Sequence, residues 1–119
     1  MRFKINNREF EIIERSQEEI KKEINRRCAN ENEEVKSIDE RYYGITYYDD
    51  EIIYIDKDLK EDRKRATLIH ELAHCYIGNY ITHTERQYSE EDVADIVSNS
   101  YDIIHEIVNK YFKGGESNE

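Results

Sequence analysis

The pattern of apolar and polar positions predicts two pairs of short β-strands. Residues 2–5 and 8–12 alternate on either side of an Asn-Asn pair, which tolerates the positive φ angles of a tight turn. Residues 42–48 and 51–56 are rich in Tyr and Ile and flank an Asp-Asp pair. We therefore expect an N-terminal β-hairpin and a second hairpin farther along the chain.

Three longer segments have apolar residues at helical spacing. Ser16 and Glu19 form a capping-box pattern before the first, in which apolar residues recur every four positions. The second is expected to begin with Asp58 as its cap and to end at Gly78. Ser89 begins the third, which should pack against the second through Val93, Ile96, Val97, Tyr101, Ile104, Val108 and Tyr111.

The remaining segments are polar. Residues 30–40 are acidic and nearly aperiodic, which predicts a solvated loop, although they could equally extend the first helix. The length of 119 residues suits one compact domain, which we place at residues 1–113. Residues 114–119 have nothing to bury and are expected to form a mobile tail.

Charge and composition narrow the class of partner. The 18 Lys and Arg residues against 28 Asp and Glu residues give a net charge of −10, which repels phosphate backbones, so no direct nucleic-acid partner is expected. No apolar run is long enough to cross a bilayer and no secretory signal core begins the chain, which predicts a cytoplasmic protein without a membrane partner. Cys28 and Cys75 are too few for a disulfide framework, and Cys75 is expected to pack rather than to bind metal.

The candidate chemistry lies in the second helical segment, where residues 67–75 read Thr-Leu-Ile-His-Glu-Leu-Ala-His-Cys. One helical turn places His70 and His74 side by side, and apolar neighbours on nearly every side indicate a helix buried in the core. Imidazole nitrogens bind Zn²⁺, and a catalytic zinc keeps one position for water, beside which Glu71 would act as the base. The motif predicts metal-assisted hydrolysis.

A catalytic zinc usually has three protein ligands. Tyr80 occupies the spacing at which some families place a third His, and His83 lies just beyond that spacing. Glu91, one helical turn before Asp95, resembles the Glu-x-x-x-Asp element of glutamate-zincins, in which the Glu binds zinc and the later acid orients a ligand histidine. Glu90 is the nearest rival of Glu91.

Four pieces follow one another along residues 42–100: Tyr43-Gly44-Ile45-Thr46, Ile53-Tyr54-Ile55-Asp56, Thr67 to His74, and Glu91-Asp92-Val93-Ala94-Asp95. In this order they resemble the ImmA/IrrE family of zinc metallopeptidases. The resemblance implies an α+β fold, a minimal zincin-like domain whose small antiparallel sheet packs on a buried HExxH helix and a following C-terminal helix. Carried over by position, His70, His74 and Glu91 would bind one Zn²⁺ per chain, Asp95 would support a ligand, and Glu71 would be the catalytic base.

The resulting hypothesis is a small zinc-dependent endopeptidase. The resemblance implies a fold often found in phages and other mobile elements, with members that cleave or antagonise repressor-type regulators. The expected partner is therefore a protein substrate, and the acidic net charge favours a basic transcriptional regulator. A strand ending near Asp56 could bind an extended peptide at its edge. An oxyanion donor is also expected, with four candidates left open: Tyr76, Tyr80, His83 and Tyr88.

Two alternatives have different functions. A non-catalytic zinc-containing anti-repressor would sequester a basic partner, which the net acidity favours and the intact Glu71 opposes. A DNA-associated protease resembling the SprT group shares a His-Glu-Leu-Ala-His type motif, but the acidic charge and the lack of a Cys-rich zinc ribbon oppose it.

Overall fold

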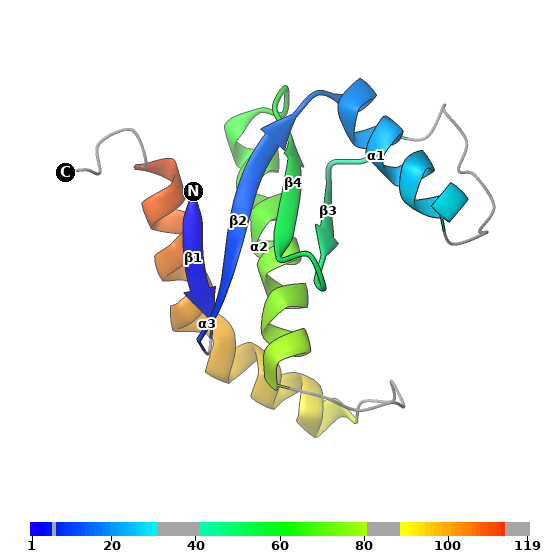
Figure 1. Cartoon of the computed structure of the whole chain (residues 1–119). Coiled ribbons are helices and arrows are strands. Elements are labelled where there is room, and N and C mark those ends of the chain that lie inside the picture. The colour runs from blue at the N-terminus through cyan, green and yellow to red at the C-terminus, as the bar shows by residue number, and fades with distance from the viewer. Residues whose placement is uncertain (6, 31–40, 81–88, 114–119) are drawn as a thin grey trace.

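The computed structural model describes residues 1–5, 7–30, 41–80 and 89–113. Its elements in chain order are β1 (Arg2–Ile5), β2 (Arg8–Arg15), α1 (Gln17–Asn30), β3 (Gly44–Tyr47), β4 (Ile52–Asp56), α2 (Glu61–Tyr80) and α3 (Glu90–Phe112). α2 and α3 lie behind the sheet in Figure 1, and α1 lies beside β3 at one end of it. The expectations for residues 31–40 and 114–119 lie outside the described residues.

The four strands form one mixed sheet in the order β1-β2-β4-β3. Both predicted hairpins are confirmed, because β1 pairs antiparallel with β2 and β3 pairs antiparallel with β4. The expected α+β class is also confirmed, but the sheet is not wholly antiparallel, because β2 and β4 pair in parallel. After β2 and α1, the chain runs back along β3, so β4 begins at the same end of the sheet as β2 and can pair with it in parallel.

This strand order changes the expected substrate edge. The strand that ends at Asp56 is β4, and β4 lies inside the sheet between β2 and β3. In the described part of the sheet, β3 is the edge strand on the α1 side. The prediction that the strand ending near Asp56 offers a free edge is therefore wrong, and β3 takes that position.

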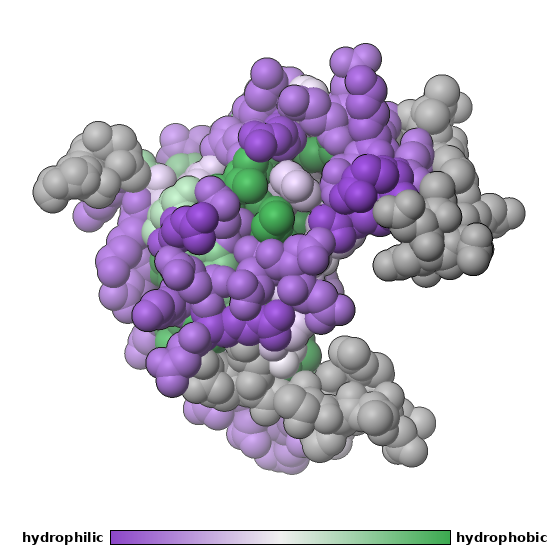
Figure 2. Space-filling view, in the orientation of Figure 1, coloured by the Kyte–Doolittle hydropathy of each residue, from purple (hydrophilic) through white to green (hydrophobic). Residues whose placement is uncertain are grey.

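One face of the sheet packs on α2 and α3 to form the main core. Alternate residues of the two central strands point to this face, and α2 contributes its buried side. The fully buried side chains here include Phe10, Ile53, Ile55, Leu68, Leu72, Cys75 and Val108. Figure 2 views the opposite face, where apolar atoms near the middle of the sheet are surrounded by hydrophilic surface.

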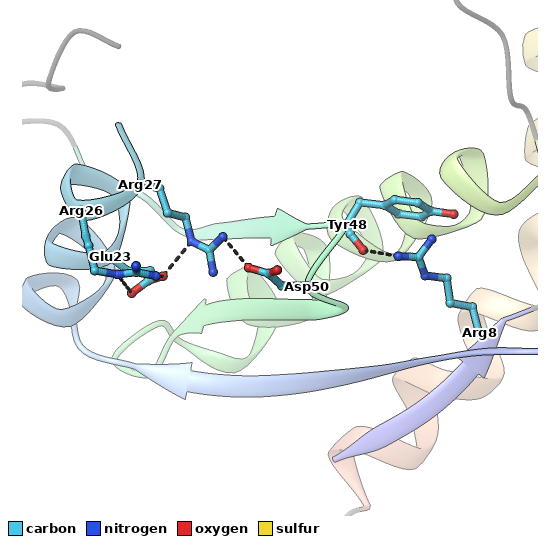
Figure 3. A network of polar contacts seen from close by, with 6 residues as sticks. All are labelled: Arg8, Glu23, Arg26, Arg27, Tyr48 and Asp50. Carbon is cyan, nitrogen blue, oxygen red and sulfur yellow. Dashed lines mark hydrogen bonds and ion pairs between the residues drawn. The ribbon is translucent and has the colours of Figure 1, made fainter. Parts of the chain in front are cut away.

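α1 packs on that opposite face, near β4 and β3. Its capping box is confirmed, since the backbone N–H of Ser16 donates to Glu19 and the Glu19 N–H donates to the Ser16 hydroxyl. Figure 3 shows the Arg27 guanidinium between Glu23 of α1 and Asp50 in the β3–β4 turn. The apolar side of the helix forms a smaller cluster: Ile20 and Ile24 with Tyr42, Ile45 and Tyr54.

Both predicted ends of α2 are wrong. The helix begins at Glu61, and the backbone N–H of Asp58 instead donates to the Asp56 carboxylate, so Asp58 belongs to the turn after β4. The helix also continues through Gly78 to Tyr80. Gly78 has a packing role, because a Cβ added there would lie 2.4 Å from Cε1 of the Tyr48 ring.

α3 begins as predicted, with a capping box between Ser89 and Asp92. It packs on α2, but its buried residues begin only at Ser100, near the middle of the helix. Val93, Val97 and Tyr101 are 48%, 59% and 57% exposed, so these members of the expected packing face are not in the core. Helical spacing predicts which side of α3 is apolar. It does not predict where along the helix that side becomes buried, because burial depends on where α3 crosses α2.

Candidate active site

The two histidines of the motif lie on one exposed side of α2. The ring centroids of His70 and His74 are 4.9 Å apart and the ring planes are 80° from parallel. Both side chains are exposed, although their helix is buried on its other side. Two neighbouring imidazoles that face outward are the donor pair that the motif predicts.

Glu71 points away from solvent, toward the edge strand. Its side chain is 6% exposed, and the Thr46 hydroxyl on β3 donates a hydrogen bond to Glu71 Oε1 at 2.6 Å. A buried carboxylate needs such a donor, because leaving its oxygen unpaired would cost free energy. The hydrogen bond thus connects the candidate base to β3, 25 residues earlier in the chain.

Sequence reasoning missed Thr46, although a signal was available. Gly44 and Thr46 stand two apart in a strand, so they share a face. A Cβ added at Gly44 would lie 2.8 Å from Cγ2 of Thr67, which shows how closely α2 approaches β3 there. Gly44 leaves room for α2 to approach the strand, and the Thr46 hydroxyl, on the same face, can then reach Glu71.

The other end of the same interface also depends on a glycine. The Tyr48 ring lies against Gly78, and the Arg8 guanidinium stacks 4.1 Å from the centroid of that ring. Arg8 also donates to the Tyr48 carbonyl at 2.9 Å, as Figure 3 shows. Close packing at both ends therefore keeps α2 beside β3 and positions the histidines along this strand.

Cys75 is a packing residue, as expected. The side chain is fully buried in the main core and forms no disulfide. Burial, assisted by the negative charge of Glu71, raises the pKa of the Cys75 thiol to about 12. At neutral pH it therefore remains a thiol, whereas metal binding requires the thiolate.

The third ligand is not assembled with the histidines. Glu91, Glu90 and Asp95 are all exposed residues in the first two turns of α3. Within residues 1–5, 7–30, 41–80 and 89–113, no group of three His, Cys, Asp or Glu side chains is placed to hold a metal ion. The buried residues of α3 begin at Ser100, so the three acidic side chains belong to a part of the helix that lies before its buried segment.

The four candidate oxyanion donors differ in what can be said of them. Tyr76 is 8% exposed and belongs to the main core, on a side of α2 away from His74. The Tyr80 side chain, His83 and Tyr88 lie outside the described part of the chain.

A pocket of about 510 Å³ opens beside the motif, between α2 and the segment that leads into β3. Its lining residues are Arg41, Tyr42, Tyr43, Gly44, Arg63, Ala66, Thr67, His70 and Glu71. Sequence reasoning did not identify the two arginines, because they lie 22 positions apart and outside the motif. The pocket extends from the candidate base toward the N-terminal end of α2.

Buried Asp56 holds the pocket segment in place. Its carboxylate accepts from Gln17 Nε2 and from Arg41 Nη2, each at 2.9 Å, and from the Asp58 backbone N–H. Burial alone would raise the pKa of Asp56, but these hydrogen bonds and the Arg41 charge outweigh it and hold the pKa below the usual range of an aspartate. Gln17 also bonds both the N–H and the carbonyl of Tyr42.

A small mixed sheet, a helix with paired histidines and a buried glutamate against an edge strand define a metallopeptidase-type domain. The family model described as the IrrE N-terminal-like domain, of peptidase family M78, matches residues 24–112. The chain belongs to this family, as the resemblance indicated. No curated protein and no solved structure matches the chain significantly. Among the helices that the structure describes, none is long and apolar enough to span a membrane.

Proposed function

We propose that this protein is a cytoplasmic zinc-dependent endopeptidase of the ImmA/IrrE type. The observation that carries the proposal is the arrangement of His70, Glu71 and His74: two exposed imidazoles side by side, with the glutamate between them hydrogen-bonded to the edge strand. A chance His pair on a solvated helix face has no need of a buried carboxylate held by a neighbouring strand. Membership of a peptidase family supports the same conclusion.

The residues present fit a zinc site in part. His70 and His74 would hold one Zn²⁺ per chain, since two exposed imidazoles one turn apart are suitable nitrogen donors. We propose Glu91 as the third ligand and Asp95 as the residue that orients a ligand histidine. Every residue from Glu90 to Asp95 is exposed, and Ile96 is the first residue of α3 that packs against the main core. Docking of this turn on α2 is therefore compatible with the fold.

Glu71 is the proposed general base. Bound zinc supplies a Lewis acid that polarises the peptide carbonyl and makes the attacking water more acidic. The Glu71 carboxylate accepts a proton from the attacking water and later returns it to the leaving amine. The hydrogen bond from Thr46 holds the carboxylate in one orientation, so Glu71 need not change its side-chain conformation before it accepts a proton.

The substrate would bind along β3. An edge strand can bind an extended peptide through its backbone, and β3 is the edge strand that contacts Glu71. The net charge of −10 favours a protein with a basic surface, and a transcriptional regulator of a phage or other mobile element is the proposed target. The same charge disfavours direct nucleic-acid binding.

The test compares metal content and hydrolysis in matched variants. Wild-type protein should contain one zinc per chain and cleave its protein substrate. Glu71→Gln should retain zinc and fold but lose hydrolysis, because the amide cannot accept a proton. Glu61→Gln is the control, since it removes one exposed carboxylate from the same helix.

Two results would contradict the proposal. Wild-type protein that takes up no stoichiometric zinc would remove the metal site, and hydrolysis by Glu71→Gln at the wild-type rate would exclude Glu71 as the base.

A further inference from the structure

The pocket beside the motif has an unusual charge for so acidic a protein. We call this pocket, between α2 and the segment that leads into β3, the Arg63 pocket. Among the described residues that line it, Arg41 and Arg63 are cationic and Glu71 alone is anionic. A chain with a net charge of −10 therefore presents a locally basic pocket next to its candidate base.

The two arginines face a shared aromatic ring. The guanidinium carbon of Arg63 lies 4.9 Å from the centroid of the Tyr43 ring, and that of Arg41 lies 5.5 Å from it. Such stacking orients a guanidinium while leaving its N–H groups free to bind a planar anion. The Tyr43 ring thus places both guanidinium groups beside the same pocket.

Arg41 and Arg63 differ in whether a neighbouring carboxylate compensates their positive charge. Arg41 forms an ion pair with buried Asp56 at 2.9 Å, so its charge is largely compensated. Among the described residues, no carboxylate forms an ion pair with the guanidinium of Arg63, and this side chain lines a pocket large enough for a substrate side chain. Arg63 is therefore the available anion-binding group.

The pocket wall is held by buried interactions rather than by surface contacts. Asp56 is fully buried and bonds Gln17 and Arg41, and Gln17 in turn bonds the backbone of Tyr42. These contacts hold the segment that carries Tyr43 against the start of β3. This wall of the pocket is therefore built from contacts within the protein itself.

We propose that the Arg63 pocket binds an Asp or Glu side chain of the substrate, on the C-terminal side of the cleaved bond. This inference rests on the proposed peptidase function. β3 runs from Gly44 to Tyr47, so a peptide paired antiparallel with it runs from Tyr47 toward Gly44. Residues after the cleaved bond then approach the pocket, which lies at the Gly44 end. A carboxylate matches the planar fork of a guanidinium, whereas a Lys or Arg side chain would be repelled.

The first experiment measures binding and does not depend on activity. The full-length wild-type protein, prepared without metal and labelled with ¹⁵N, is titrated with N-acetyl-glutamate and with N-acetyl-glutamine while the amides of Gly44 and Thr67 are followed by NMR. The glutamate probe should bind about fivefold more tightly, the amount expected for one solvent-accessible ion pair. The preference should fall as salt is added.

A matched arginine serves as the control. Arg63→Gln should abolish the preference for glutamate, whereas Arg65→Gln should keep it, because Arg65 stacks on Phe112 and does not line this pocket. Equal binding of the two probes, no binding of either, or equal effects of the two variants would overturn the assignment.

The second experiment measures specificity in hydrolysis. Zinc-loaded wild-type protein is given an unbiased peptide library, and the new N-termini of the products should be enriched in Asp and Glu within their first three residues. Arg63→Glu should shift the enrichment to Lys and Arg. Cleavage without this enrichment would overturn the pocket assignment alone, whereas failure to cleave any peptide would count against the peptidase proposal and leave the NMR titration to decide the pocket.

Discussion

Removing the hydroxyl of Thr46 should weaken both the fold and the candidate active site. Thr46→Val preserves the shape of the side chain but removes the donor that lies 2.6 Å from Glu71 Oε1. Glu71 is only 6% exposed, so the lost donor would be replaced by water only in part. A hydrogen bond to a charged group contributes about 1.5–3 kcal/mol, and we expect the free energy of unfolding to fall by roughly that amount at neutral pH.

Urea denaturation of the metal-free protein measures this loss. Thr46→Ser keeps the hydroxyl and should lose much less stability than Thr46→Val. A double-mutant cycle with Glu71→Gln isolates the pairwise term, and a coupling of about 1 kcal/mol or more is expected because these two residues are in direct contact.

The same variant tests the role of Thr46 in hydrolysis. Thr46→Val should lower kcat/KM while leaving the zinc content unchanged, because His70 and His74 are untouched. Thr46→Ser should restore most of the activity. Unchanged stability of Thr46→Val together with a coupling energy near zero would refute the inferred link between β3 and the candidate base.

Three further predictions concern other parts of the fold and site. Because hydrogen bonds and the Arg41 charge hold the folded-state pKa of Asp56 below its ordinary value, its contribution to stability is present above that ordinary pKa and is lost as the pH falls through the folded-state pKa. Asp56→Asn should therefore cost about 1–3 kcal/mol at pH 7 and flatten the acid side of a urea-midpoint profile. Gly78→Ala should lower the melting temperature despite the better helix propensity of Ala, because its Cβ would overlap the Tyr48 ring and overpacking costs about 1–3 kcal/mol; an equal or higher melting temperature would contradict this. Competitive chelator titration should show a sharp loss of zinc affinity in Glu91→Ala and little change in Glu90→Ala, and the reverse order would mean that the ligand is Glu90.

The sequence by itself determined the parts of this protein that depend on near neighbours. Strand patterns and turn residues predicted both hairpins, and the Ser16 and Ser89 capping boxes began their helices as expected. Spacing alone also placed His70 and His74 on one side of a helix. These features arise within about four residues along the chain, where backbone geometry and side-chain reach are sufficient to specify them.

Tertiary structure decided what depends on distant contacts. The parallel pairing of β2 with β4 places β3 at the sheet edge, and that position brings Thr46 to Glu71. Gly78 resembles a helix end in sequence, but the ring of Tyr48 gives it a packing role inside the helix. The same holds for the Arg63 pocket, whose walls come from α2 and the segment before β3. Local sequence patterns do not predict such contacts, because strand order and helix crossing depend on the shared core that forms only when the whole chain folds.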